Sequence, residues 1–203
     1  MKIIEGLEQG SEAWLAYRRR KITATDTSAL LKINPWSSPQ DIYNEKFQLV
    51  PPKEVNSRML EGQLLEPEAR ALFIDHMKIE MVPAVVESIK YPFMMASLDG
   101  ISNNRKQILE IKVPSEKSHL AALDGVIAEY YKCQMQKQLL VTGAEVCYYF
   151  SYRPLCKEPI AIIMIWPKLD FHNRIIEAER DFYEDCMLTM TPPVPEWTLK
   201  QRK

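Results

Sequence analysis

The chain has 203 residues, a formal charge of -1 at pH 7, 46% hydrophobic residues and 26% charged residues, which predicts one domain with an ordinary buried core over residues 1–203. This charge excludes a protein that holds nucleic acid through a global basic field, so any such binding has to come from local clusters. Neither the first residues nor the longest apolar run, 160–166, is typical of a signal peptide or a membrane span.

Four cysteines lie at positions 133, 147, 156 and 186. None belongs to a C-x-x-C pair, and no histidine cluster accompanies them, which disfavours zinc and iron–sulfur sites. The spacing predicts reduced thiols in a cytosol.

The first fifty residues are expected to be mainly helical. Ser11 is a candidate N-cap for a helix that ends in the basic run 18–21, and a Ser- and Thr-rich segment before Ala29 marks another helix start. Because free N–H groups at a helix start bind anions, Arg18 and Thr25 are candidate phosphate contacts. Capping explains Thr25 equally well, and a solvated helix end explains the basic run.

Two further helices are predicted before the first strand. Pro39 suits the first position of one, which the prolines at 51–52 terminate. A longer helix over 56–77 contains Pro67, which we expect to kink it or to start a new segment. Glu66 lies at that break, either as a surface residue or as a further metal-site acid. The apolar stripe of this helix is expected to comprise Met59, Leu60, Leu64, Ala69, Leu72 and Phe73.

A predicted hairpin follows a strand at 82–89 that contains Pro83, an edge-strand signal. It consists of a strand over 93–99, a turn over 100–106 and a return strand over 107–113. Side chains alternate between the two faces of a strand. The alternation places Leu109, Ile111 and Val113 toward the core, and Ile108, Glu110 and Lys112 on the other face.

Ser97 and Asp99 share one face of the first hairpin strand, so two carboxylates and an ammonium group can converge there. Asp99 and Glu110 would supply oxygen ligands for Mg²⁺ or Mn²⁺ beside a substrate phosphate. Lys112 would orient a water molecule and offset charge on the phosphate. The pattern alone is weak, because a hairpin with a charged, solvated face shows the same alternation.

The rest of the chain predicts helices over 115–123 and 126–141, strands over 146–152 and 159–166, a helix over 169–188 and an irregular tail over 191–203. Gln134 and Gln138 fall on the apolar stripe of the second of these helices and need hydrogen-bond partners there, which could be protein groups, a catalytic water or a DNA phosphate. The predicted fold class is α/β (α+β), with a central mixed sheet flanked by helices and the candidate site at the strand ends.

Several segments match the motifs of one family in order. They are residues 8–15 with Arg18 (E-Q-G-x-x-x-W…R), 22–25 (I-T-A-S), 62–66 (G-x-x-x-E), 97–100 with 110–112 (S-x-D-G and E-x-K) and 131–136 (Y-x-x-Q-x-Q). The chain thereby resembles the lambda-type phage exonucleases, the YqaJ-like viral recombinase group of the PD-(D/E)xK nuclease superfamily, over residues 8–143. Two positions depart from the pattern: Leu98 replaces the expected proline, and Thr25 replaces serine but keeps the hydroxyl.

The resemblance implies a restriction-endonuclease-like core and a Mg²⁺-dependent 5′→3′ exonuclease, with Mn²⁺ able to substitute. Such an enzyme degrades one strand of linear duplex DNA from a 5′-phosphorylated end and leaves a 3′ single-stranded overhang. It also implies a homotrimeric ring around DNA, a phage single-strand annealing protein as partner, no membrane association, and the cytosol of a bacterial host that carries the phage or prophage.

The resemblance also implies roles for individual residues. Its metal ligands would be Asp99, Glu110, the backbone carbonyl of Ile111 and, at a second site, Glu66. Lys112 would activate the water and Gln134 would orient the water or a ligand. The pocket for the terminal phosphate would comprise Arg18, Thr25 and Ser97.

Two other functions stay open. A PD-(D/E)xK endonuclease or junction resolvase would cut a covalently closed circle, whereas an exonuclease needs an end. A non-catalytic DNA-end-binding module would bind ends without releasing nucleotides, although Asp99, Glu110 and Lys112 are all present.

Overall fold

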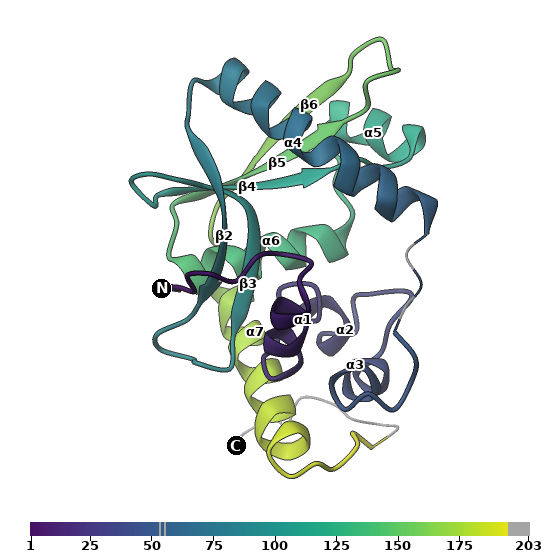
Figure 1. Cartoon of the computed structure of the whole chain (residues 1–203), viewed down its shortest axis with the longest axis vertical. Coiled ribbons are helices and arrows are strands. Elements are labelled where there is room, and N and C mark those ends of the chain that lie inside the picture. Colours follow the sequence, from purple (N-terminus) through teal and green to yellow (C-terminus); the bar gives the residue numbers. More distant parts are fainter. Residues whose placement is uncertain (53, 55, 195–203) are drawn as a thin grey trace.

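The computed structural model describes residues 1–52, 54 and 56–194. Its elements, shown in Figure 1, are β1 (Lys2–Ile3), α1 (Glu12–Arg19), α2 (Thr27–Leu30), α3 (Pro39–Lys46), α4 (Ser57–Met77), β2 (Met81–Glu87), β3 (Met95–Ser102), β4 (Gln107–Lys112), α5 (Glu116–Leu123), α6 (Glu129–Thr142), β5 (Val146–Tyr152), β6 (Ile160–Ile165), α7 (Leu169–Phe182) and a π-helix, η1 (Tyr183–Met187). Residues 191–194 have no regular structure, as predicted, and the rest of the expected tail lies outside the described residues.

The strands form one six-stranded sheet in the order β1-β2-β3-β4-β5-β6. All neighbours are antiparallel except β4 and β5, which run parallel. A parallel neighbour requires a crossover connection, and α5 and α6 supply it between these two strands. The predicted mixed sheet flanked by helices is confirmed.

Helices cover both faces of the sheet (Figure 1). On one face α4 packs Ala69 and Phe73, both fully buried, against β4 and β5. The Phe73 ring lies 5.3 Å from that of Tyr148 and 5.6 Å from that of Phe150, measured between centroids. Burial of one such aromatic side chain contributes about 1.5–3 kcal/mol. The packing of Phe73 against β5 therefore stabilises the position of α4 on the sheet.

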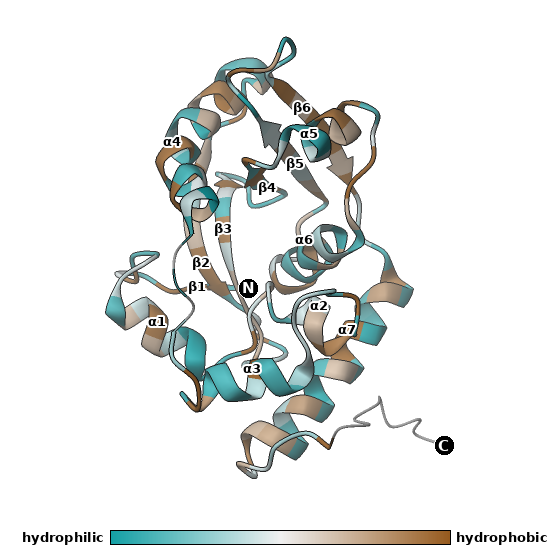
Figure 2. Ribbon diagram, turned by 90° about the vertical axis from the view of Figure 1, so that its right-hand side faces the viewer, coloured by the Kyte–Doolittle hydropathy of each residue, from teal (hydrophilic) through white to brown (hydrophobic). Residues whose placement is uncertain are grey.

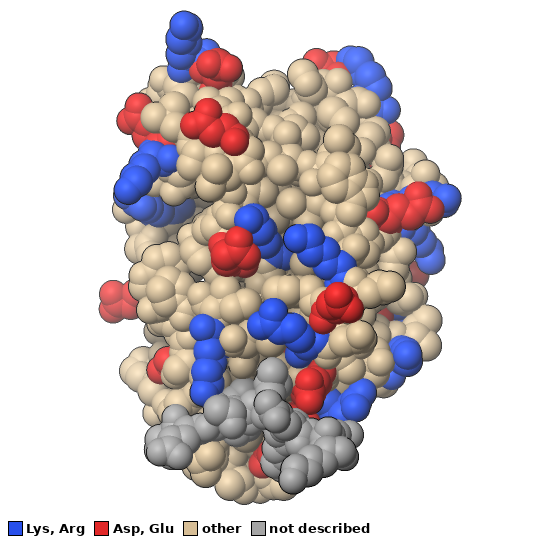
Figure 3. Space-filling view, turned by 180° about the vertical axis from the view of Figure 1, so that it is seen from behind, with Lys and Arg blue, Asp and Glu red and all other residues tan. Residues whose placement is uncertain are grey.

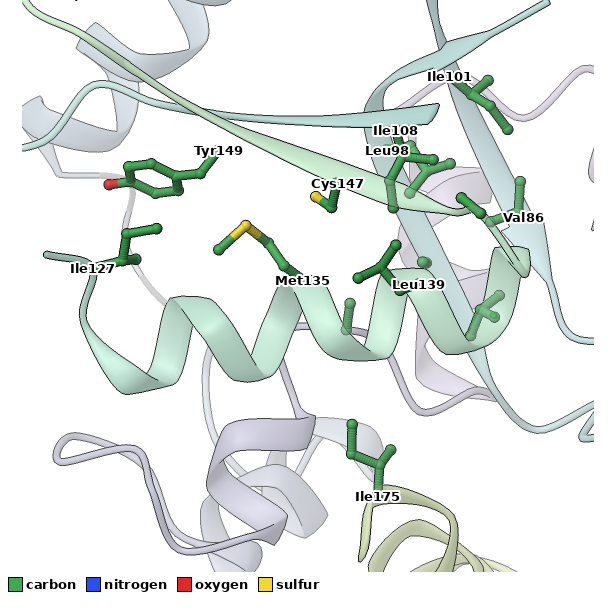
Figure 4. Close-up of a cluster of buried hydrophobic side chains, with 14 of the residues drawn as sticks. Val86, Leu98, Ile101, Ile108, Ile127, Met135, Leu139, Cys147, Tyr149 and Ile175 are labelled. Atoms are coloured by element: carbon green, nitrogen blue, oxygen red, sulfur yellow. The ribbon is translucent and has the colours of Figure 1, made fainter. Parts of the chain in front are cut away.

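On the other face α6 is buried between the sheet and α7. Met135 and Leu139 point from α6 toward Cys147 and Tyr149 of β5, while Ile175 of α7 approaches from the opposite side (Figure 4). Since both sheet faces are covered, Ile108 and Glu110 are buried at 0% and 1% exposure. The hairpin therefore has no solvated face of the kind considered from the sequence.

The predicted apolar stripe of α4 is wrong in four of its six members. At 100° per residue, Leu60 and Leu64 lie roughly 180° around the helix from Ala69 and Phe73, so they cannot share one contact with the sheet. The exposed members, at 39–71% exposure, are Met59, Leu60, Leu64 and Leu72. Pro67 does not divide the helix, because α4 is one continuous element across it.

The strand boundaries differ from the prediction in informative ways. β3 continues past Gly100 to Ser102, which shortens the predicted turn. A Cβ added at Gly100 would lie 2.9 Å from the Cβ of Met81, so glycine is required here by close packing of β2, not by a turn. Pro83 falls at a register shift on β2, beyond the two-residue β1, and so on a free edge as expected.

The helix boundaries hold to within a few residues. Ser11 caps α1 and Asn56 caps α4 through their side chains, and Pro39 occupies the first turn of α3. The predicted helix at 126–141 begins only at Glu129. The last helix changes to π geometry after Phe182.

The described part of the chain contains neither a disulfide nor a helix that could span a membrane. No disulfide joins the four cysteines, all of which it contains. None of its helices is both long and apolar enough to cross a membrane.

Candidate active site

The candidate site lies where the sheet forks between β3 and β4. These strands pair at Ile101 with Ile108 and at Gly100 with Leu109, and the ladder ends there. Beyond that point β3 continues along β2, and β4 continues along β5 as far as Lys112. The next ladder position is taken by a side chain, because the N–H of Ile111 donates to Asp99 Oδ2 at 2.7 Å.

Three consecutive backbone carbonyls of β3 lie at the fork, and each receives a side-chain donor. Gln138 Nε2 lies 3.4 Å from the Ser97 oxygen, Gln9 Nε2 lies 3.1 Å from that of Leu98, and Arg70 Nε lies 2.6 Å from that of Asp99. Buried backbone groups without partners are costly. These donors from α6, the N-terminal segment and α4 therefore hold the fork open.

Glu110 is clamped at the base of the fork. Its Oε1 accepts a hydrogen bond from Gln134 Nε2 at 2.6 Å and one from Lys112 Nζ, while Oε2 accepts one from Gln138 Nε2. The two glutamines that the sequence placed on an apolar stripe thus find their partner in this carboxylate. Lys112 also lies over the Tyr131 ring, with Nζ 5.0 Å from the centroid.

Acids outnumber cations in this cluster. Burial and the neighbouring Glu110 charge raise the pKa of Asp99 well above its usual range, and Glu66 adds to the effect. Burial alone would lower the pKa of Lys112, but the carboxylates of Glu110 and Asp99 raise it above its ordinary value. The lysine therefore stays charged, while the raised pKa of Asp99 opposes a second negative charge beside Glu110.

This chemistry fits a divalent cation only with help from a substrate. In the described part of the chain no three Asp, Glu, His or Cys side chains gather closely enough to hold a metal by themselves. Mg²⁺ is commonly bound by one or two carboxylates, with water and substrate phosphate completing its shell. Asp99 and Glu110 meet that requirement, and a cation would relieve their mutual repulsion.

Asp99 and Lys112 open into a cleft of about 730 Å³. Its lining includes residues of both α4 and α6, two helices that Figure 2 shows on either side of β4. Glu66, from the middle of α4, lines this cleft together with Ile111, while its Oε1 accepts a hydrogen bond from Arg70. The structure therefore brings Glu66 to the same cleft as Asp99, whereas the residue pattern alone left it as a surface residue or a further metal-site acid.

The three predicted phosphate contacts lie around Trp14. The Trp14 indole N–H donates to Ser97 Oγ at 3.0 Å, and the Arg18 guanidinium lies 4.3 Å above the Trp14 ring centre. Arg18 Nη2 also donates to Thr25 Oγ1 at 3.2 Å. Arg18, Thr25 and Ser97 are thus linked through hydrogen bonds and one stacked ring.

Thr25 is not the N-cap of a helix, contrary to the expectation from the sequence. α2 has only four residues, its N-cap position is Asp26, and Thr25 is exposed before it. Asp26 instead forms an ion pair with Lys46 at 2.6 Å and accepts the Thr23 N–H at 2.8 Å. Neither capping nor a helix dipole therefore accounts for Thr25, and a phosphate would rely on the side chains themselves.

Three residues that hold the site were not assigned to it from the sequence. Gln9 lies within a recognised motif and Gln138 on a buried stripe, so both carried a signal. Arg70 carried only its spacing of four residues from Glu66, a common surface pattern. Its bond to the Asp99 carbonyl depends on the packing of α4, which no local pattern specifies.

A family model described as "YqaJ-like viral recombinase domain" matches residues 13–145. The chain belongs to the YqaJ-like viral recombinase family. Among relatives, the family member YqaJ of Bacillus subtilis (strain 168) is 28% identical over 193 residues, covering 89% of this chain and 58% of YqaJ. R354 of Acanthamoeba polyphaga mimivirus is 29% identical over 161 residues, covering 72% of this chain and 29% of R354. The chain thus spans only about 58% and 29% of the lengths of these relatives.

Solved structures share the fold of this YqaJ-like chain. An alkaline exonuclease, LHK-Exo from Laribacter hongkongensis, superposes with a TM-score of 0.78 at 24% identity, covering 89% of this chain and 94% of LHK-Exo. A phage-related exonuclease from Haemophilus somnus 129PT superposes with a TM-score of 0.64 at 14% identity, covering 84% and 96%. These matches confirm the predicted fold, and the family model confirms the predicted family.

Proposed function

We propose that the chain is a Mg²⁺-dependent exodeoxyribonuclease that degrades one strand of linear duplex DNA in the 5′→3′ direction and leaves a 3′ single-stranded overhang. The observation that carries this proposal is the fork of β3 and β4, where Asp99 and Lys112 line one cleft and the buried Glu110 carboxylate accepts a hydrogen bond from Lys112. The fold shared with two exonucleases agrees with it, as does a structure of LHK-Exo in complex with dAMP.

Each residue of the fork has a distinct task in this proposal. Asp99, Glu110 and the Ile111 carbonyl would hold Mg²⁺ or Mn²⁺, with Glu66 as an acid for a second ion. The ion would polarise the phosphodiester and make a bound water molecule more acidic. Gln134 fixes the Glu110 carboxylate at 2.6 Å, so it acts as a positioning residue for this ligand.

Lys112 would orient the attacking water and stabilise charge on the phosphate. Its raised pKa keeps the ammonium form at neutral pH, so it donates hydrogen bonds and does not serve as the free base. A fixed cation beside developing negative charge is worth most in a site shielded from solvent, and the Lys112 side chain is only 22% exposed.

The phosphate pocket favours an exonuclease over an endonuclease. Ser97 precedes Asp99 by two residues on β3, so both point to the same face, and Ser97 links through Trp14 to Arg18. A 5′-phosphate held by Arg18, Thr25 and Ser97 would place a phosphodiester near the end of the strand beside Asp99. A closed circle offers no such phosphate.

Several features support a ring-shaped homotrimer that encloses the DNA. The described part of the face in Figure 3 carries Lys and Arg interspersed with Asp and Glu, without a continuous basic surface. Retention by encirclement needs fewer salt-sensitive phosphate contacts than retention by charge. Leu60 and Leu64 of α4, 51% and 71% exposed, offer apolar surface for a neighbouring subunit. A phage single-strand annealing protein would receive the overhang in the bacterial cytosol.

Digestion of linear duplexes tests the proposal. We expect Mg²⁺-dependent release of mononucleotides from duplexes with a 5′-phosphate, slower release from 5′-hydroxyl ends, and none from covalently closed circles or in EDTA. Labels at the two ends of one strand would reveal the direction. Cutting of closed circles would favour an endonuclease, and binding of ends without nucleotide release would favour a non-catalytic module.

A further inference from the structure

A solvent-exposed tryptophan stands at the mouth of the catalytic cleft. Trp36 lies on the loop between α2 and α3 and is 74% exposed. Its ring meets Tyr130 of α6 edge-on, with 5.1 Å between centroids and 76° between planes. Both residues line the cleft that also contains Asp99 and Lys112.

The ring of Trp36 is not needed to order its own loop. The backbone N–H of Trp36 donates to Asn34 Oδ1 at 2.9 Å, and Asn34 Nδ2 donates to Ser28 Oγ at 3.2 Å. On the other side Ser38 and Asp41 form a reciprocal capping box at the start of α3. These polar contacts fix the backbone, so the indole is presented to solvent by a pre-formed loop.

Aromatic rings continue from Trp36 to the reacting centre. The Tyr130 and Tyr131 rings lie 4.4 Å apart, and Lys112 Nζ lies 5.0 Å from the Tyr131 ring. Arg58 of α4 lines the same cleft. Rings for bases and cations for phosphate thus line one cleft, which is the combination that single-stranded nucleic acid requires.

At 74% exposure the indole keeps accessible surface that Tyr130 does not cover. A flat ligand can therefore stack on Trp36 without displacing Tyr130. A base inside a duplex already has both faces covered by its neighbours, so only an unpaired or terminal base can use such a surface. A strand whose phosphate lies at Lys112 would have a neighbouring base in the same cleft as Trp36 and Tyr130.

We propose that Trp36 and Tyr130 form a stacking subsite for an unpaired nucleobase next to the scissile phosphate. The inference rests on the proposed nuclease function for the identity of the ligand. The subsite is tolerant of base identity, because every base has a π-face. It favours substrates whose terminal base pair has opened.

Binding of two matched oligonucleotides tests the subsite. One is a 5′-phosphorylated single strand, and the other has the same length with abasic residues at its first three positions. Both are measured by fluorescence anisotropy with Ca²⁺ in place of Mg²⁺, after a gel has shown that no product forms. The wild-type protein should bind the first about 5- to 150-fold more tightly, the range expected for stacking of one base.

Three variants locate the effect. Trp36→Ala should lose most of the preference for the intact strand, while Trp36→Phe should keep part of it. Trp166→Ala is the control, because Trp166 is 58% exposed but does not line this cleft. Equal affinities of the wild-type protein for the two strands, no binding of either, or an unchanged preference in Trp36→Ala would overturn the inference.

This outcome is separable from that of the proposed function. If the protein digests linear DNA but Trp36→Ala keeps the full preference for bases, the subsite is wrong and the nuclease assignment stands. If no digestion occurs but Trp36→Ala abolishes the preference, the subsite stands and the nuclease assignment is wrong.

Discussion

Two buried lysine–glutamate pairs, one in the cleft and one between helices, have lysine pKa values that are shifted in opposite directions. In the cleft, Glu110 and Asp99 hold the pKa of Lys112 above its ordinary value. Between α6 and α7, Lys137 and Glu179 are both 0% exposed. There, burial lowers the pKa of Lys137 and raises that of Glu179, so it opposes charge on both partners.

The number of acids beside each lysine explains the difference. Lys112 is close to two carboxyl groups, and the excess of acids leaves room for a cation. Lys137 forms its ion pair with Glu179, with a weaker attraction from Asp26, and the other Glu179 oxygen accepts a hydrogen bond from Thr27 Oγ1 at 2.7 Å. That pair is complete, so it fastens α6, α7 and α2 together but offers nothing to a ligand. The same two residue types therefore build a candidate active site and a structural bond.

Removal of the cleft charges should have the largest effect. We expect Asp99→Ala and Lys112→Ala each to lower the digestion rate by about 10²–10⁴-fold without changing the circular dichroism spectrum. Lys106→Ala is the matched control, because Lys106 lies beside the same hairpin with a 60% exposed side chain paired to Glu145. Substantial residual activity in either site variant would refute the assignment.

Removal of the helix pair should affect stability and not chemistry. We expect Lys137→Met to lower the free energy of unfolding by about 3–5 kcal/mol, because it leaves Glu179 buried without its partner. The double variant with Glu179→Gln should recover most of the loss, and the digestion rate per folded molecule should stay unchanged. Urea titration measures the first quantity. A loss of activity in the stably folded double variant would contradict a purely structural role.

Asp26 extends the comparison, because it is a buried acid beside two cations, whereas Lys112 is a buried cation beside two acids. Burial alone would raise its pKa, but Lys46 and Arg18 lower it below the usual value. Its contribution to stability is therefore present above the ordinary pKa of about 4 and is lost as pH falls through the lowered value. We expect Asp26→Asn to cost about 1–3 kcal/mol at pH 7.

The pH dependence provides the check on Asp26. Urea midpoints measured from pH 2 to pH 6 should fall less steeply below pH 4 in Asp26→Asn than in the wild-type protein. Asp75→Asn should leave the midpoints almost unchanged, because Asp75 pairs with Lys78 on the surface with side chains 82% and 76% exposed. Parallel pH profiles for Asp26→Asn and the wild type would contradict this account.

Arg18 tests whether the pocket of Arg18, Thr25 and Ser97 selects a 5′-phosphate, while the cleft with Asp99 and Glu66 selects a metal ion. We expect Arg18→Ala to lower the ratio of digestion rates for 5′-phosphate and 5′-hydroxyl ends by about tenfold, the effect of one lost charge-assisted hydrogen bond. Arg20→Ala, an exposed neighbour, should leave that ratio unchanged. An unaltered ratio in Arg18→Ala would make the basic run a solvated helix end.

The sequence predicted the parts of the fold that local patterns encode. Ser11, Pro39 and Asn56 mark helix starts through capping chemistry, and the apolar runs at 146–152 and 159–166 predicted neighbouring strands. Two strands of the hairpin and the positions of Asp99, Glu110 and Lys112 followed from alternation. The two-residue β1 was missed, because it is too short to show any periodicity.

The missing information concerns tertiary packing. Alternation identified the face that carries Glu110 but not that α6 buries it. Six apolar residues of α4 are grouped as one stripe by the sequence pattern, although only Ala69 and Phe73 among those six are buried. The fork was invisible for the same reason: Gln9, Arg70 and Gln138 come from three distant segments, and their shared task depends on where β3 leaves β4.

Anomalous diffraction from a crystal soaked in manganese tests the central claim most directly. We predict one anomalous peak within about 2.5 Å of carboxylate oxygens of both Asp99 and Glu110, with Lys112 displaced from Glu110 Oε1 toward the cleft. An anomalous map with no ion between those two carboxylates, from protein that digests DNA in the same manganese solution, would contradict the account.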